Sequence, residues 1–325
     1  QSGTGGSNNF RIPSMITLGD GTVVAAADAR WNHSGDACSI DIMVSRSTDN
    51  GATWNYDIPV YFNDSTNAKA TYGACFIDPV MVRDGNNKIY MMVDLYPGGI
   101  AINTAPKSPE TASGFVDTSA NPDVQSDENY SYYVGEYGED GLAPVYEVYG
   151  VDSYSTTPSF YMDRKFYLYT AQKEKMYCPQ IDGDNLDNGS IVQQNVFFNN
   201  SILHVRCATY LYLITSTDNG ETWSAKEKIY PEDGNAVYCT ELSVEGDEIT
   251  AYLTIHNGRF LNWKCVMMKS FDNGYTWKNY GAPPHFPEYT FIRTQIHTSK
   301  GDIVIPYQHY PVKQEDVERV FNDEM

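Results

Sequence analysis

The chain has 325 residues, which is enough for two domains with a sizeable core. Its net charge of −20 argues against a nucleic-acid-binding protein and favours a soluble, secreted monomer whose charge opposes self-association. No run approaches 18 apolar residues, so the sequence predicts no membrane insertion. The six cysteines are scattered without a Cys-x-x-Cys pair, which argues against zinc and favours free thiols over an occasional disulfide.

The first nine residues, QSGTGGSNN, predict a flexible linker or a processed end from which an export signal has been removed. Short β-branched and aromatic runs bounded by Gly, Asn and Asp follow, and they predict strands. These runs are Thr22–Ala27, Ile89–Leu95, Phe166–Thr170, Ile249–Ile255 and Ile303–Tyr307. Only Lys313–Val320 suggests a helix. We therefore expect an all-β protein.

One motif, Ser-x-Asp-x-Gly-x-Thr-Trp, occurs three times, at Ser47–Trp54, Ser216–Trp223 and Ser270–Trp277. Each copy follows a strand-like run and centres on Asp-Asn-Gly, where Asn and Gly tolerate the positive φ angles of a tight turn. We expect the Ser and Asp side chains to bind backbone N–H groups of the turn and the Trp to fold over it. Repeats of this kind are typical of β-propeller blades, and we expect these three to be structural.

The spacing of the motifs predicts the domain organisation. Asp218 and Asp272 are 54 positions apart, about one four-stranded blade, whereas Asp49 and Asp218 are 169 apart. The excess of about 115 residues predicts a β-rich domain at 101–205, inserted into a propeller formed by 1–100 and 206–325. The remaining length suits about four blades of this size. Either some blades are shorter, or this chain does not carry the whole ring, because an open ring exposes strand edges.

Several stretches resemble a known family. Phe10-Arg11-Ile12-Pro13, then Asp28-Ala29-Arg30 and Asp36, lie in a stretch to Trp54 that resembles the opening blade of the bacterial exo-α-sialidases of glycoside hydrolase family 33. The resemblance is to the type with an inserted β domain, covers about residues 10–225, and is weaker beyond. It continues in three further stretches, Cys75–Val82, Asp94–Gly98 and Asn195–Trp223.

This resemblance implies a six-bladed propeller that cleaves terminal sialic acids from glycans or glycoproteins, outside the cell or on its surface. The family uses no cofactor or metal. A tyrosine replaces the usual carboxylate nucleophile, which suits an anomeric carbon that already carries a carboxylate. Arginines bind that carboxylate through their planar fork, a local attraction that a chain of net charge −20 needs.

Four site residues of the first half follow from the resemblance. Arg11 would be the first arginine of the carboxylate clamp, and Asp36 the acid/base that protonates the leaving oxygen and then activates water. Arg30 would contact the sugar near its carboxylate or 4-position. Asp78, in an apolar run where an unpaired carboxylate is costly, would face the sugar's polar substituents.

In the second half, Glu241 matches the glutamate that activates the nucleophile, and Arg259 the second clamp arginine. About two extra residues separate them relative to the family. Arg293 is a candidate for the third clamp arginine. The nucleophile's own context is not recognisable, and the candidates for it are Tyr289, Tyr307 and Tyr310. A truncated, composite or divergent chain would each explain this departure.

Two other functions stay open. The first is a catalytically inactive propeller that binds sialylated glycans. The second is an intramolecular trans-sialidase, which transfers the sialic acid intramolecularly instead of hydrolysing it. The distinction from hydrolysis depends on how far water is excluded from the site.

Overall fold

The computed structural model describes residues 3–31, 33–36, 39–60, 74–96, 98, 115–117, 132–150, 153–163, 166–182, 185–198, 201–203, 210–224, 227–229, 236–256, 264–274, 276–282, 290–292, 296–297, 303–304 and 307–309. Apart from one 3-10 turn at Thr4–Gly6, the regular structure there is β-strand, which confirms the all-β prediction. No helix in this part of the chain is long and apolar enough to cross a bilayer. The predicted helix at Lys313–Val320 lies outside the described residues.

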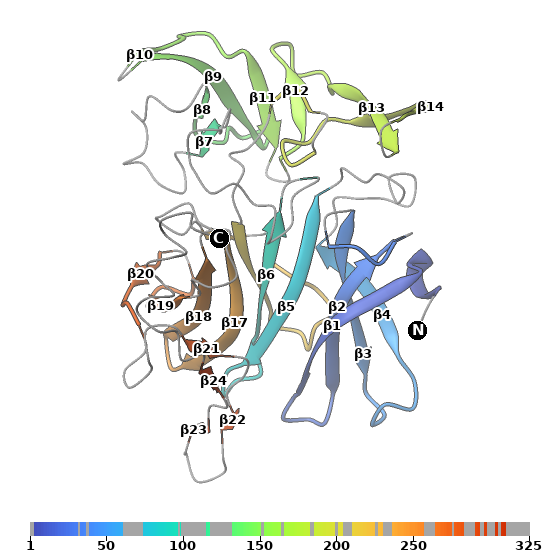
Figure 1. Cartoon of the computed structure of the whole chain (residues 1–325), viewed down its shortest axis with the longest axis vertical. Helices are drawn as coiled ribbons and strands as arrows, with labels where there is room; N and C mark the ends of the chain where they lie inside the picture. Colours follow the sequence, from blue (N-terminus) through green and yellow to red (C-terminus); the bar gives the residue numbers. More distant parts are fainter. Residues whose placement is uncertain are drawn as a thin grey trace, which may run out of the picture.

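The first blade is an antiparallel meander of four strands (Figure 1). They are β1 (Asn9–Thr17), β2 (Val23–Arg30), β3 (Ile40–Ser47) and β4 (Asn55–Val60). The second blade has the same form, with β5 (Cys75–Arg83), β6 (Ile89–Tyr96), β15 (Tyr210–Ser216) and β16 (Glu227–Ile229). A single parallel bridge, Ile40 to Cys75, joins the two blades into one sheet.

The third blade consists of β17 (Ala236–Glu245), β18 (Glu248–His256), β19 (Lys264–Ser270) and β20 (Lys278–Asn279). After it, β21 (Thr290–Ile292) pairs with β24 (Tyr307–His309), and β22 (Ile296–His297) pairs with β23 (Ile303–Val304). The register of these two pairs is that of one irregular hairpin. Within the described residues no sheet closes on itself, so a six-bladed ring stays a prediction.

The strands between β6 and β15 form two separate sheets, so they interrupt the second blade between its second and third strands (Figure 1). The larger sheet contains β7 (Phe115–Asp117), β8 (Tyr132–Val134), β9 (Leu142–Gly150), β10 (Ser153–Tyr154), β11 (Phe160–Asp163) and β12 (Leu168–Thr170). The smaller pairs β13 (Tyr177–Asp182) with β14 (Asn185–Gln193). The domain limits 101 and 205 stay predictions.

Aromatic side chains pack the interrupting strands onto the second blade. Phe166 makes edge contacts with Phe197 and with Tyr212 of β15, and Tyr212 in turn contacts Phe76 of β5. All four side chains are buried and belong to one hydrophobic cluster that also includes the first blade. The burial of these large rings explains how the interruption is anchored, since aromatic side chains contribute much of the apolar area that folding removes from water.

The three motifs form the same Ser and Asp hydrogen bonds, as predicted, although Trp223 Nε1 of the second motif has no hydrogen-bond partner among the described residues. In the first, Gly51 N donates to Ser47 Oγ (2.8 Å), Thr53 N donates to Asp49 Oδ1 (2.8 Å), and Trp54 folds back to donate to Gly51 O (3.0 Å). The central Asn residues have φ near 60°, the left-handed region that Asn tolerates. Each turn joins the third strand of a blade to the fourth, away from the end where the interrupting strands leave β6.

We predict that Asp218→Ala destabilises the protein, because this carboxylate accepts hydrogen bonds from Ser216 Oγ, Thr222 N and Thr222 Oγ1. These bonds lower its pKa to about 2. The expected fall in the midpoint of thermal unfolding is roughly 2–4 °C. Asp247→Ala is the matched control, because that exposed turn carboxylate has no hydrogen-bond partner among the described residues. Equal midpoints for the two variants would contradict a structural role for the motif.

Candidate functional site

The site lies where the first strands of the blades break register. In β1 the pairing with β2 shifts between Arg11 and Ser14, and in β5 the pairing with β6 shifts between Ile77 and Val80. Both breaks hold an X-Pro pair, Ile12-Pro13 and Asp78-Pro79, and Pro is tolerated at a bulge because it has no N–H to donate to the ladder. Ile12 and Asp78 have φ of 50° and 58°. These bulges set the directions of the neighbouring site residues.

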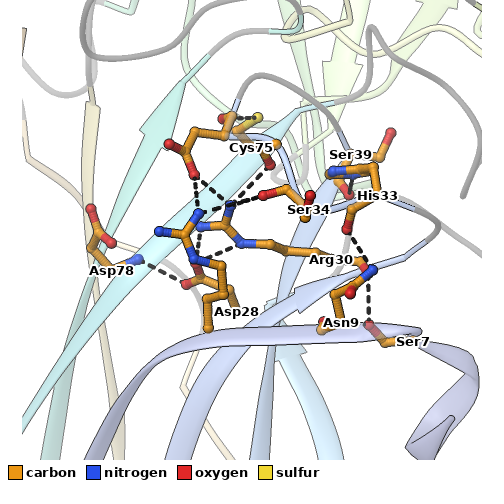
Figure 2. A network of polar contacts seen from close by, with 12 residues as sticks. Ser7, Asn9, Asp28, Arg30, His33, Ser34, Ser39, Cys75 and Asp78 are labelled. Carbon is orange, nitrogen blue, oxygen red and sulfur yellow. Dashed lines mark hydrogen bonds and ion pairs between the residues drawn. The ribbon is translucent and has the colours of Figure 1, made fainter. Parts of the chain in front are cut away.

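Beneath the bulges lies a buried ion pair between Asp28 and Arg30 of β2 (Figure 2). Their side chains are 0% and 1% exposed. Arg30 Nη2 and Nε donate to Asp28 Oδ2 at 2.7 and 3.3 Å, and Asp28 Oδ1 accepts the backbone N–H of Asp78 at 3.0 Å. One carboxylate therefore joins the first blade to the bulge of the second.

Arg30 also holds the loop that follows β2. Its Nη1 donates to Ser34 O (2.9 Å) and Gly35 O (3.0 Å) and pairs with the Asp36 carboxylate. From the other side, the buried thiol of Cys75 donates to the Asp36 carbonyl oxygen at 3.1 Å (Figure 2). Both the backbone and the side chain of Asp36 are thus fixed. In this structure the Nε, Nη1 and Nη2 of Arg30 all donate to groups within the protein. Contact of Arg30 with the sugar stays a prediction.

The solvent-facing part of the cluster is the pair Arg11–Asp36. Arg11 Nη1 lies 3.1 Å from Asp36 Oδ1, and both side chains are 48% exposed. The Nε and Nη2 of Arg11 have no partner among the described residues. The buried Arg30 thus supports the exposed Arg11 and the exposed Asp36 carboxylate. Such an arrangement can bind an anion and transfer a proton beside it.

Three carboxyl groups lie close enough to influence one another, the fully buried Asp28 and Asp94 and the partly buried Asp78, and burial raises the pKa of each. Burial and the negative charge of Asp78 raise the pKa of Asp28 to about 7, although Arg30 opposes the shift. Burial raises the pKa of Asp78 to about 6, against the attraction of Arg30. Burial, together with the charges of Asp78 and Asp28, raises the pKa of Asp94 well above its ordinary value. The three carboxyls therefore share one electrostatic environment.

Glu241 follows a third register break, between Cys239 and Glu241 in β17, and its side chain is half-buried. Asp94 Oδ1 accepts the Cys239 N–H at 3.0 Å, which ties β17 to the same cluster. Arg259 and Arg293 lie outside the described residues, as do Tyr289 and Tyr310; Tyr307 lies in β24. The described residues contain no group of three or more His, Cys, Asp or Glu suited to a metal ion.

The structure therefore brings together Arg11, Arg30, Asp36 and Asp78 and adds residues that the sequence analysis gave no role. Asp94 and Cys75 were noted only as parts of family-like stretches, and Asp28 only as part of Asp28-Ala29-Arg30. The available signal was an acidic residue inside an otherwise apolar strand, as in the buried β6. Four cysteines, Cys75, Cys178, Cys239 and Cys265, are free buried thiols; Cys38 and Cys207 lie outside the described residues.

We predict that Asp94→Asn weakens the pH dependence of stability. Because the pKa of Asp94 is raised in the folded state, the folded protein keeps a proton that the unfolded chain releases near pH 4. The contribution of Asp94 to the free energy of unfolding then falls as the pH rises from the unfolded pKa toward the folded one, by at most about 1.4 kcal/mol per pH unit. Chemical unfolding at pH 5 and pH 6 should show a shallower fall for Asp94→Asn than for wild type or Asp247→Asn. Parallel falls would contradict the buried, protonated Asp94.

Comparisons with known proteins show which families and folds this chain resembles. The family described as BNR repeat-like domain matches residues 12–138, and the family described as BNR/Asp-box repeat matches residues 214–225. The anhydrosialidase of Macrobdella decora is 31% identical over 67% of this chain and 31% of its own length. Sialidase B of Streptococcus pneumoniae is 28% identical over 91% of this chain and 45% of its own length.

The chain thus spans less than half the length of each of these two relatives. Among solved structures, the intramolecular trans-sialidase from Ruminococcus gnavus, in complex with oseltamivir carboxylate, superimposes with a TM-score of 0.66 at 24% identity. It covers 92% of this chain and 65% of its own, which shows the same fold. The resemblance that Phe10–Trp54 predicted is confirmed: this chain is related to the bacterial sialidases of glycoside hydrolase family 33 and has their β-propeller architecture.

Proposed function

We propose that this chain is the catalytic propeller of an exo-α-sialidase that hydrolyses terminal sialic acids from secreted or cell-surface glycoconjugates. The observation that carries the proposal is the exposed Arg11–Asp36 pair, 3.1 Å apart, supported from below by the buried Asp28–Arg30 pair. The sialidase relatives support the same reading.

Arg11 binds the substrate carboxylate. Its Nε and Nη2 lack partners among the described residues, so two parallel N–H groups are available to a carboxylate in the geometry that arginine favours. The net charge of −20 repels an anionic sugar at long range, so a local cation must supply the attraction. Arg259 and Arg293 complete the clamp in this proposal.

Asp36 is the acid/base. It protonates the departing glycosidic oxygen and then takes a proton from the attacking water. Glu241 activates a tyrosine, chosen among Tyr289, Tyr307 and Tyr310, that attacks the anomeric carbon. Two successive displacements at this carbon give net retention of configuration. Asp78 faces the polar substituents of the sugar.

A second candidate is intramolecular transfer, which the name of the leech relative, anhydrosialidase, favours. Such a protein cleaves the same bond, but a hydroxyl group of the sialic acid itself, instead of water, then attacks the anomeric carbon. The deciding test is turnover of a fluorogenic α-sialoside with analysis of the sugar product. Free sialic acid supports hydrolysis, and an anhydro sugar supports transfer. Binding of sialosides without turnover would support the inactive, glycan-binding alternative and contradict both enzymes.

We predict that Asp36→Ala lowers turnover of a natural sialoside by about 10²–10⁴-fold, because its leaving alcohol needs a proton. The first step with a phenolate leaving group should suffer much less, since a phenolate departs without protonation. Single-turnover rates with both substrates measure this, and Asp218→Ala, at the far end of a blade, is the matched control. Equal losses with both leaving groups would make Asp36 a structural residue.

A further inference from the structure

Asp28 and Asp94 occupy the same position in two successive blades. Asp28 pairs with Arg11 just before the register break of β1, and Asp94 pairs with Ile77 just before the register break of β5. On the other side, their partners Ile42 and Leu211 each stand five residues before the Ser of the turn motif. The two aspartates are therefore equivalent in a repeated framework, although only Asp28 has a neighbouring arginine in its strand.

Both aspartates make the same bond to the next blade. Asp28 Oδ1 accepts the N–H of Asp78 in the bulge of β5, and Asp94 Oδ1 accepts the N–H of Cys239 at the bulge of β17, each at 3.0 Å. A bulge removes backbone groups from the ladder, and a buried N–H without an acceptor is costly. A short, buried acid on the preceding blade supplies that acceptor.

The residue at each bulge is one that the proposed chemistry uses. In the second blade the N–H belongs to Asp78 itself. In the third blade it belongs to Cys239, and Glu241 is the first residue beyond the break. The bond from the preceding blade thus fixes the part of the first strand from which the site residue projects.

We propose that Asp94 is a positioning residue that aligns Glu241 through β17, and that Asp28 does the same for Asp78. The inference rests on the proposed sialidase function.

Thr254 continues the pattern in the third blade: it pairs with Cys265, five residues before Ser270, and its buried Oγ1 has no hydrogen-bond partner among the described residues.

The two aspartates differ in charge, and this difference makes the proposal testable. Asp28 is paired with Arg30, so Asp28→Asn removes the buried anion of this guanidinium and leaves it only the half-exposed Asp36 carboxylate. Asp94 has no cation, and its Oδ2 has no hydrogen-bond partner among the described residues. A neutral acceptor is sufficient there, so Asn should replace Asp94 but not Asp28.

The test compares Asp94→Leu, Asp94→Asn and the control Val93→Ala, a buried neighbour on the same strand whose side chain belongs to the hydrophobic cluster. We expect Asp94→Leu to lower kcat by about 10- to 100-fold, because small misplacements of a reacting group have effects of this size. KM should change little, and the loss should be equal for alcohol and phenolate leaving groups, unlike that of Asp36→Ala. Asp94→Asn should keep kcat within about threefold, and Val93→Ala should lose stability but not kcat.

Hydrogen exchange at the Cys239 amide gives a readout independent of activity. Exchange should be faster in Asp94→Leu than in wild type, Asp94→Asn or Val93→Ala. Equal exchange, or equal kcat, in Asp94→Leu and Val93→Ala overturns the proposal. If Asp94→Leu does not fold, a loss of kcat above tenfold in Asp94→Asn overturns it instead. An inactive wild-type protein in which only Asp94→Leu exchanges faster contradicts the sialidase function while supporting the alignment of β17.

Discussion

The buried pair of Asp28 and Arg30 is the interaction on which the rest of the site depends. Desolvating two charges is expensive, and such a pair is tolerated when its geometry is good and its remaining hydrogen-bonding groups are satisfied. Here Arg30 satisfies the carbonyls of Ser34 and Gly35 and the Asp36 carboxylate, while Asp28 satisfies the N–H of Asp78. The pair thereby fixes a loop of the first blade and a bulge of the second. Removing Arg30 would leave the Asp28 carboxylate buried without a counter-ion, at a cost of about 3–5 kcal/mol, whereas removing Asp28 would leave Arg30 paired only with Asp36.

The two ends of the blades differ in the hydrogen bonds that hold them. At one end, the turn motifs use exposed hydrogen bonds within a few residues, as between Thr53 and Asp49, so each turn is locally determined. At the other end, two of the key bonds cross between blades, from Asp78 to Asp28 over 50 positions of sequence and from Cys239 to Asp94 over 145 positions. The interrupting strands leave β6 and return to β15 at this second end (Figure 1). The local turns therefore stabilise the individual blades, whereas Asp28 and Asp94, which bond to the next blade, position the site residues.

Sequence reasoning succeeded where the determinants are local. The turn motifs were predictable because Asn-Gly tolerates a positive φ and the Ser and Asp oxygens lie beside their donors, and the strands β2, β3, β6, β15 and β18 followed from β-branched runs. The roles of Arg11 and Asp36 were assigned only through the family resemblance, and their contact was not predicted. The burial of Arg30 and the roles of Asp28, Cys75 and Asp94 were not predictable, because each depends on which blade packs beside it. An aspartate in an apolar strand gives no indication of whether a cation, an N–H group or solvent lies opposite.

The site depends on Asp28, Asp78 and Asp94, whose pKa values lie above those of ordinary aspartates. The direct measurement is a pH titration of the aspartate 13Cγ resonances in the ligand-free protein, assigned with single Asp→Asn variants. We expect midpoints of about 7 for Asp28 and about 6 for Asp78, and an Asp94 midpoint well above that of an ordinary aspartate. Titration of all three groups below about pH 5, as for ordinary solvent-exposed aspartates, would contradict this expectation.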